Sequence, residues 1–262
     1  MSNGDSYTEV TTKSWGSRLM ESIKGVLVGL LLFLAAFPVL FKNEGCSVKT
    51  AKGLEEGGKA AIHVEIDKVD PANNGKLVHM TGQAVTDETL TDPLFQVSDK
   101  GIRLSRNVEM YQWKEVSESK TEKKMGGKEE TTTTYRYEKD WSSTRIDSSK
   151  FKKQGYNNPQ MPYSSQSWQA KLVNLGAFRL SPSLISQITD GEKISLDQAA
   201  FNRLPATVKT GAVLNDGGIY KGNNPSDPQI GDLRINFNIV KPQEVSILSR
   251  QQNATFEAYK TS

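Results

Sequence analysis

The chain contains few of the residues from which most catalytic and metal sites are built. Its 262 residues include two histidines, His63 and His79, and one cysteine, Cys46. A single cysteine excludes an intramolecular disulfide and a cysteine-based zinc site. The H-E-x-x-H, G-x-S-x-G, P-loop and dinucleotide-binding motifs are also missing from the sequence. We therefore expect no catalytic residues, no cofactor and no metal site, and the histidines to be ordinary residues of two different strands.

The chain also lacks an excess of either charge. It has 33 basic and 30 acidic residues, and the two signs are interspersed. A nucleic-acid-binding protein gathers basic residues on one face, so we expect no nucleic-acid partner. The mean hydropathy of -0.53 is typical of a water-soluble chain, but the apolar residues are unevenly distributed.

One long hydrophobic run stands out near the N-terminus. It begins at Gly25, ends at Phe41 and contains no charged residue over 17 positions. As a helix it would be about 26 Å long, slightly shorter than the ~30 Å hydrocarbon core of a bilayer. Lys24 and Lys42 flank the run and can extend toward the headgroups. Pro38 falls in the last turn, where a missing hydrogen bond costs least. The run predicts a transmembrane helix at 25–41.

Two further features belong to this predicted anchor. In residues 1–24, apolar residues recur every four positions from Trp15, which predicts a short interfacial helix with Trp15 at headgroup depth. Gly25 and Gly29 form a G-x-x-x-G pair, which allows two membrane helices to approach closely. Glycine is common in membrane helices, so the pair is also compatible with no contact at all.

Other interpretations of the N-terminal run are weaker. A cleaved signal peptide would end near Ala36, but the apolar run continues five residues further. A lipoprotein attached through Cys46 is also disfavoured, because the charged Glu44, two residues earlier, does not belong in a lipid-attachment motif. The basic residues on the two sides of the run are nearly balanced, so charge does not decide the orientation.

The remainder of the chain predicts an α+β fold, a strand-rich soluble domain with one N-terminal transmembrane helix. A juxtamembrane connector at 42–59 can extend the helix before Gly57 and Gly58 end it. The soluble domain covers 60–262, and a polar connection at 148–166 can divide it into two lobes. Alternating apolar residues predict strands, and capping residues predict two short helices. The strands are expected at 62–66, 77–85, 102–113, 131–137, 233–239 and 245–248, and the helices at 182–188 and 197–204.

Residues 114–134 form a low-complexity segment. Between Lys114 and Glu130 there are five lysines and five glutamates around Gly126 and Gly127. A strand rich in threonine and tyrosine follows, so the segment predicts a solvated hairpin tip, with a docking role as the alternative.

Several motifs, in order, resemble the LUMA family of transmembrane proteins, which occur in the endoplasmic reticulum and nuclear envelope of animals and have bacterial relatives. The most specific are VEMYQW at 108–113 and YRYEKDW at 135–141. The others are FKNEG at 41–45, VKTAKGLEEG at 48–57, GKLVHMTG at 75–82, DP at 92–93, NP at 158–159 and GDLR at 231–234. The resemblance points to a bacterial relative.

The resemblance implies a non-enzymatic protein that organises membrane-protein complexes, with a cytoplasmic N-terminus and a lumenal or periplasmic domain. The implied partners are the lipid bilayer, other membrane proteins and further copies of the chain in a homo-oligomer. The implied location is a bacterial inner membrane or the endoplasmic reticulum and nuclear envelope. Family members continue into several more membrane helices after this domain.

The interface of such a scaffold could be a strand edge or the face that carries Tyr111 and Trp113, although an aromatic residue of this kind more often belongs to the core. Two other functions stay open at this stage. One is a membrane-tethered sensor or binding module for lipid or envelope ligands, and the other is an envelope hydrolase.

Overall fold

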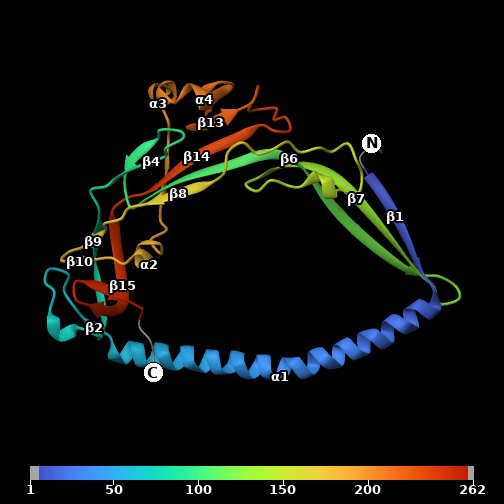
Figure 1. Cartoon of the computed structure of the whole chain (residues 1–262), viewed down its shortest axis with the longest axis horizontal. Coiled ribbons are helices and arrows are strands. Elements are labelled where there is room, and N and C mark those ends of the chain that lie inside the picture. Colours follow the sequence, from blue (N-terminus) through green and yellow to red (C-terminus); the bar gives the residue numbers. More distant parts are fainter. Residues whose placement is uncertain (1–5, 259–262) are drawn as a thin grey trace. The chain divides into compact units, whose positions relative to one another are not determined.

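The computed structural model describes residues 6–258 and divides into two compact units (Figure 1). The first, here called the ribbon unit, comprises residues up to 52 together with 112–140 and 146–159. The second, here called the sheet unit, comprises 53–111, 141–145 and 160 onward. The chain leaves the ribbon unit for the last time between Pro159 and Gln160, inside the predicted connection. Because each unit is built from three segments, neither is a continuous half of the chain.

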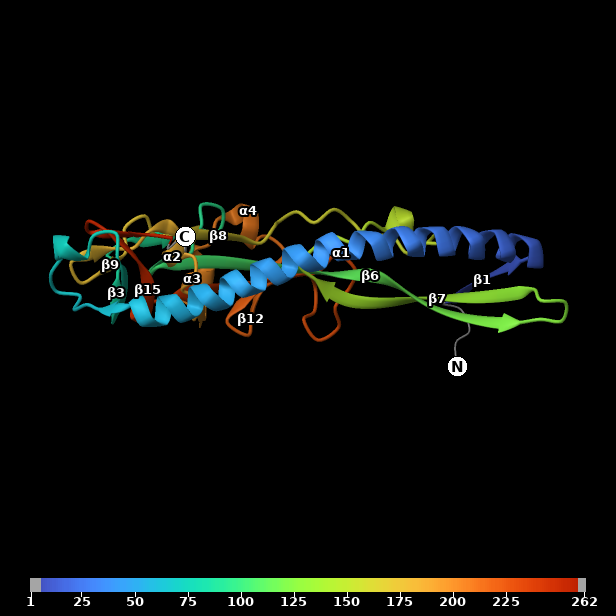
Figure 2. The same cartoon turned by 90° about the horizontal axis from the view of Figure 1, so that it is seen from below.

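A single helix, α1 (Trp15–Ala60), contains both the predicted interfacial helix and the predicted span (Figure 2). Its 46 residues would measure about 69 Å at 1.5 Å per residue. The expected end of the helix at Gly57 and Gly58 is wrong, because α1 continues through both. Lysine, alanine and glutamate are frequent in this stretch, and their helix propensity offsets the cost of the glycines. The sequence predicts Pro38 in the last turn of the membrane helix. Because α1 continues to Ala60, Pro38 lies well inside the observed helix.

The ribbon unit contains a strand that was not predicted. β1 (Ser6–Lys13) precedes α1 and pairs antiparallel with β7 (Glu129–Ser142) over eight residues. β7 in turn pairs with β6 (Arg103–Lys123), so the unit contains a three-stranded ribbon in the order β1-β7-β6. The predicted hairpin tip is confirmed, since the Lys124 amide donates to the Lys128 carbonyl at 2.8 Å. Gly126 supplies the positive φ of +82° that this turn requires.

The sheet unit contains two main sheets. In the first, the N-terminal half of β6 pairs with β14, which pairs with β13 and then β12, while β8 adds to β6 and β11 to β14. In the second, the order is β10-β9-β3-β15-β16, with β2 parallel to β3, and β4 and β5 form a separate pair. The strands of the first sheet are β8 (Gln166–Gln169), β11 (Glu192–Ile194), β12 (Ala212–Asn215), β13 (Gly218–Lys221) and β14 (Leu233–Val240). The others are β2 (Ile62–His63), β3 (Leu77–Val85), β4 (Thr89–Thr91), β5 (Ser98–Lys100), β9 (Asn174–Leu175), β10 (Phe178–Arg179), β15 (Gln243–Gln252) and β16 (Thr255–Glu257). The short helices are α2 (Pro182–Ile185), α3 (Gln198–Arg203) and α4 (Ala206–Lys209), with 3-10 turns η1 (Pro71–Asn73) and η2 (Ser148–Lys150).

Strong two-residue periodicity located the central strands well. β3 has the predicted bounds, and β14 extends the prediction by one residue. In β14 the predicted apolar side, including Ile235 and Phe237, is fully buried. β6 and β15 are longer than predicted, whereas β2 keeps only two of its five predicted residues. The helices α2 and α3 occur where predicted but are shorter.

Two apolar clusters form the core of the sheet unit. One lies under the β3–β15 sheet and includes Met80, Phe178 and Ile247. The other lies beneath β14, where Phe95 and Phe237 form an edge-to-face pair with centroids 5.6 Å apart. Each cluster draws on strands from distant parts of the sequence, so the unit buries its core only after long-range pairing.

A buried ion pair lies beside the second cluster. Arg106 Nη1 is 2.6 Å from Asp92 Oδ2, and their side chains are 4% and 0% exposed. The other Asp92 oxygen accepts from the amides of Leu94 and Phe95, and Arg106 Nε donates to the Ser164 carbonyl. The guanidinium also lies 5.0 Å from the centre of the Phe95 ring. Both ions are therefore hydrogen-bonded on several sides, as buried charges must be.

We predict that Arg106→Leu lowers the free energy of unfolding by about 3 to 5 kcal/mol, because it leaves the Asp92 carboxylate buried without its cation. The matched control is Lys100→Leu, which breaks an ion pair of the same 2.6 Å length at the surface, with Asp87. Exposed pairs contribute little, so this control should shift the midpoint only slightly. Urea unfolding of the detergent-solubilised chain measures both, and equal shifts would contradict a structural role for the buried pair.

Candidate functional site

The first candidate functional surface is the apolar length of α1. Among residues 6–258, Trp15–Asn43 is the one helical stretch long and apolar enough to cross a membrane, and none of its most apolar window is buried. Val26, Leu31 and Phe41 are 71%, 68% and 74% exposed. An apolar surface this long is far larger than the scattered apolar residues of a soluble protein. Burial in lipid removes it from water.

The predicted anchor residues all lie on this helix. Trp15 is its first residue and is 62% exposed, and Lys24 and Lys42 are exposed on either side of the apolar length. A Cβ atom built on Gly25 or Gly29 would meet no other atom within 4 Å. The glycine face is therefore open, as contact with a second helix requires.

The second candidate surface is the distal part of the ribbon, where β6 and β7 carry a polar ladder. Threonine and serine hydroxyls pair across the two strands, at 2.8 Å between Ser119 and Thr133 and 2.9 Å between Thr121 and Thr131. On the other face of β7, charged side chains lie next to residues of β6 and of the hairpin turn. Glu130 is 3.2 Å from Lys124, and Arg136 is 3.4 Å from Glu118. These contacts are solvent-exposed and contribute little stability individually.

Trp113 belongs to an aromatic cluster within the ribbon unit. Its ring meets Tyr156 edge-on at 4.9 Å, and Tyr156 stacks on Tyr137 with centroids 4.0 Å apart. The Asn158 side chain holds the strand beside the cluster, since its oxygen accepts from the Trp113 amide at 2.7 Å and its nitrogen donates to the Trp113 carbonyl at 2.9 Å. The NP motif at 158–159 thus has a structural task that sequence reasoning did not assign. An asparagine directly before a proline, inside the polar connection at 148–166, was the available signal.

Tyr111 belongs to a separate cluster within the sheet unit. Its ring centroid is 5.2 Å from that of Trp141, and the Arg234 guanidinium lies over Trp141 at 3.9 Å. Arg234 is also 3.2 Å from Glu109, its neighbour on β6. Tyr111 and Trp113 are both half-buried, so each has one side packed and one side accessible. Their role at an interface stays a prediction.

The two histidines, expected on different strands, lie side by side in the sheet unit. His63 of β2 and His79 of β3 are partners in a parallel pair, and their Nδ1 atoms are 3.4 Å apart. His79 Nε2 is 2.8 Å from Ser246 Oγ, and His63 Nε2 is 3.7 Å from Glu65. These contacts are exposed to solvent. Ser246 lies in the middle of β15 and not at the sharp turn that presents the nucleophilic serine of a hydrolase. In the described part of the chain, no three His, Cys, Asp or Glu side chains gather as metal ligands would.

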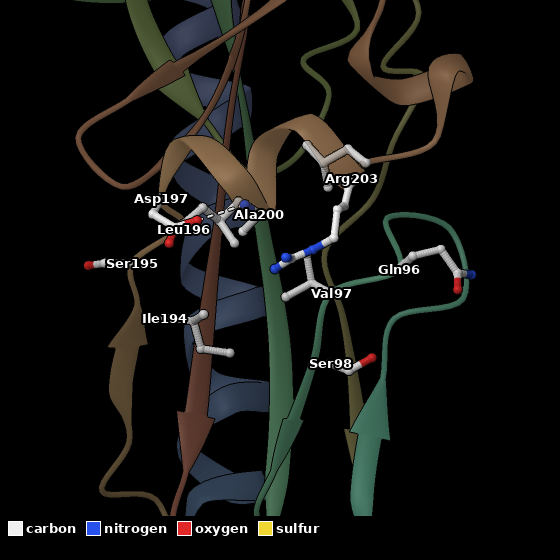
Figure 3. Close-up of a pocket in the computed structure, with 10 residues that line it drawn as sticks. Gln96, Val97, Ser98, Ile194, Ser195, Leu196, Asp197, Ala200 and Arg203 are labelled. Atoms are coloured by element: carbon white, nitrogen blue, oxygen red, sulfur yellow. Dashed lines mark hydrogen bonds between the residues drawn. The ribbon is translucent and has the colours of Figure 1, made fainter.

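The sheet unit also contains a pocket of about 370 Å³ between α3 and the β4–β5 connection (Figure 3). Arg203 of α3 extends over Val97, and Asp197 caps the helix by accepting from the Ala200 amide at 2.6 Å (Figure 3). The lining combines polar residues such as Gln96 and Ser98 with an equal number of apolar residues such as Ile194 and Leu204. Deep apolar walls, which a lipid-binding cavity needs, are not a feature of this lining.

Together, an exposed apolar helix and a strand-rich domain define a class of protein, namely a membrane protein whose water-soluble part is built mainly from strands. The profile of the Transmembrane protein 43 family matches residues 110–262, which is more than half of the chain. The chain therefore belongs to the Transmembrane protein 43, or LUMA, family.

Individual relatives agree with this assignment. Transmembrane protein 43 of Homo sapiens is 36% identical over 223 residues, which cover 84% of this chain and 54% of the human protein. The protein of Mus musculus is 33% identical over 93% of this chain and 62% of its own length. The homolog of Drosophila melanogaster is 26% identical over 90% of this chain and 63% of its own length. The matched part of the chain thus spans between 54% and 63% of the length of these curated relatives. No solved structure matches the fold.

We predict that α1 holds the chain in the bilayer, so that alkaline carbonate leaves it in the membrane pellet. In the double variant Leu30→Arg and Leu31→Arg, each arginine adds about 2.5 to 3.5 kcal/mol to the cost of insertion. This variant should move to the supernatant, because both side chains project from the exposed apolar length. Release of the unaltered chain by carbonate would show that α1 is not a retained anchor.

The aromatic cluster of the ribbon unit predicts that the folded protein loses stability at alkaline pH. Burial, and then the hydrogen bond to Glu115, raises the pKa of Tyr137 from 10.0 to about 12. Between these two pH values Tyr137 stays protonated in the folded state, whereas the same phenol ionises in the unfolded state. Its contribution to the free energy of unfolding is therefore complete below about pH 10 and is lost as the pH rises through about 12. Tyr137→Phe removes the ionisable group and should flatten the decline in the urea midpoint over that range. Parallel pH profiles for the two proteins would contradict this assignment.

Proposed function

We propose that this chain is a membrane-anchored, self-associating scaffold that organises membrane-protein complexes without catalysing a reaction. The observation that carries the proposal is the open apolar surface of α1, with Gly25 and Gly29 both exposed. Within residues 6–258 none of the most apolar window of this helix is buried, so lipid and other helices are its natural neighbours. Family membership supports the membrane setting.

The shape of the ribbon unit supports an assembly role. Its strands β6 and β7 are 21 and 14 residues long, with the N-terminal part of β6 in the sheet unit, whereas strands of globular proteins typically have five or six. Over much of this length the side chains are threonine, serine, lysine and glutamate, which provide no apolar core of their own. A long polar ribbon with an accessible edge is suited to binding another strand.

The proposal includes a location and an orientation. The strand-rich domain lies on the periplasmic side of a bacterial inner membrane, or on the lumenal side of the endoplasmic reticulum and nuclear envelope. The segment before α1 lies in the cytoplasm. Its partners are the bilayer, other membrane proteins and further copies of the chain. The LUMA motifs support this arrangement, because such a topology is what the resemblance implies.

A hydrolase is the alternative with a specific observation in its favour, the contact between Ser246 and His79. A nucleophilic serine needs an adjacent base and donors that stabilise the oxyanion. Ser246 lies in mid-strand, and Thr81 also contacts its hydroxyl, at 3.4 Å. The contacts match a polar ladder across paired strands, so we favour the scaffold. The sensor alternative would require an apolar cavity, and polar and charged residues make up half of the lining of the pocket at Arg203.

The native mass in mild detergent, measured by light scattering with size exclusion, tests self-association. We expect a uniform multiple of the 29.0 kDa chain. Replacing Gly25 and Gly29 with isoleucine should reduce this multiple, since branched side chains hold neighbouring helices apart, and a Cβ atom at either position has no described atom within 4 Å. The matched control places isoleucine at Ala35 and Ala36, on the same helix. A monomeric unaltered chain would refute the scaffold, whereas an unchanged oligomer in the glycine variant would refute only the glycine contact.

A further inference from the structure

The pairing of β1 with β7 conflicts with a membrane-spanning α1. β1 ends at Lys13, just before α1, and β7 lies more than eighty residues after the apolar length. Between them, in the described chain, no second helix qualifies as a membrane span. A helix that crosses once places the segments before and after it on opposite sides of a hydrocarbon layer ~30 Å thick. Strands 4.7 to 4.9 Å apart in a sheet cannot be separated in this way.

A second contact in the ribbon unit has the same consequence. A Cβ atom on Gly127, in the tip of the β6–β7 hairpin, would lie 3.0 Å from the Trp15 ring. Trp15 belongs to the start of α1, and the hairpin tip belongs to the domain that follows it. The structure therefore shows the chain with its first segment docked on the hairpin, and this docked form and the membrane-spanning form exclude each other.

We propose that insertion of α1 vacates the outer edge of β7, and that this edge then pairs with β7 of a second copy of the chain. The inference rests on the proposed self-association and names the surface that carries it. Insertion removes residues 6–13 from all eight of their partner positions on β7. The exposed row of backbone N–H and C=O groups is a template for another strand. β1 shows that the edge accepts an antiparallel strand in unbroken register.

The sequence of β7 is complementary to itself in one register. When Thr133 lies on a twofold axis, Thr132 faces Thr134 and Thr131 faces Tyr135 of the other copy. Glu130 then faces Arg136, and symmetry repeats this opposite-charge pair at the other end. Cross-strand pairs of threonine, tyrosine and opposite charges each stabilise a sheet by about 0.2 to 1 kcal/mol.

Charge also disfavours the neighbouring registers. A displacement of two residues in one direction places Glu130 opposite Glu138, and in the other direction it places Lys128 opposite Arg136. Arg136 and Glu130 are 62% and 35% exposed, so both can reach a partner across the edge. Their present contacts with β6 are surface ion pairs, which are weak enough to be shared. Of these three registers, the one centred on Thr133 is the one that brings no like charges of residues 128–138 opposite each other.

Disulfide trapping in membranes tests the proposal. In full-length chain carrying Cys46→Ser, so that no other thiol is present, we introduce Thr133→Cys and add a mild oxidant. Opposed residues of an antiparallel pair have Cα atoms about 4.5 to 5.5 Å apart, which a disulfide can bridge. We expect a covalent dimer. The matched control, Thr131→Cys, should form none, because the two copies of residue 131 would be about 14 Å apart.

Two cysteines within one chain detect the docked form, in which β1 pairs with β7. Thr8 and Thr134 face each other in the β1–β7 pairing, so Thr8→Cys with Thr134→Cys forms an internal disulfide only when β1 occupies the edge. We expect little of this disulfide in membranes and a large increase in the non-inserting Leu30→Arg and Leu31→Arg variant. An internal disulfide in carbonate-resistant chain, without the Thr133 dimer, overturns the proposal.

The same measurements separate this inference from the proposed function. An oligomer by light scattering without a Thr133 dimer overturns the β7 interface and leaves self-association standing. A monomer overturns both. Charge exchange provides a further check, since Glu130→Lys should reduce Thr133 crosslinking several-fold, and adding Arg136→Glu should restore it. Failure of the second change to restore crosslinking would refute the register.

Discussion

The buried ion pair between Arg106 and Asp92 is the interaction on which the sheet unit depends. Asp92 orders the turn before β5, and Arg106 on β6 binds the carbonyl of Ser164 in the connection that leads to β8. The same guanidinium lies between the rings of Phe95 and Trp168, so one cation joins three separate segments. Apolar replacements could fill this volume, but they would not specify which segments meet. A buried charge has only a few acceptable partners, and this restricts the fold.

The ribbon unit follows a different physical principle. Its strands carry few buried apolar residues beyond the cluster around Tyr137, and its distal part is held by backbone ladders and hydroxyl pairs. Burial of apolar side chains adds little to the stability of such a ribbon. Backbone pairing of a further strand with its outer edge therefore adds the most stability. α1 has the opposite character, since its apolar side chains are exposed and require lipid. A ribbon edge that accepts a further strand, as it accepts β1, and an apolar helix that is stabilised in lipid are together the physical basis of the proposed assembly at a membrane.

Much of this architecture was predictable from local patterns. The apolar run gave the membrane helix, and the alternation in β3 and β14 gave their bounds almost to the residue, because burial of one face imposes a two-residue period. β1 was missed because its sequence, SYTEVTTK, has no apolar alternation and its partner lies about 120 residues away. The contact between His63 and His79 was missed for a related reason, since parallel pairing of β2 with β3 leaves no local signal.

The sequence by itself determined that a polar, strand-rich domain follows one helix able to cross a membrane, since hydrophobic length and periodicity are properties of neighbouring residues. It also identified the LUMA family through motifs whose order could be compared directly. Only the tertiary structure decided which residues meet: that Asn158 holds the strand at Trp113, that Arg234 covers Trp141, and that β1 pairs with the outer side of β7. These contacts join positions tens of residues or more apart. Their energy depends on geometry reached after folding, so no local pattern in the chain records them.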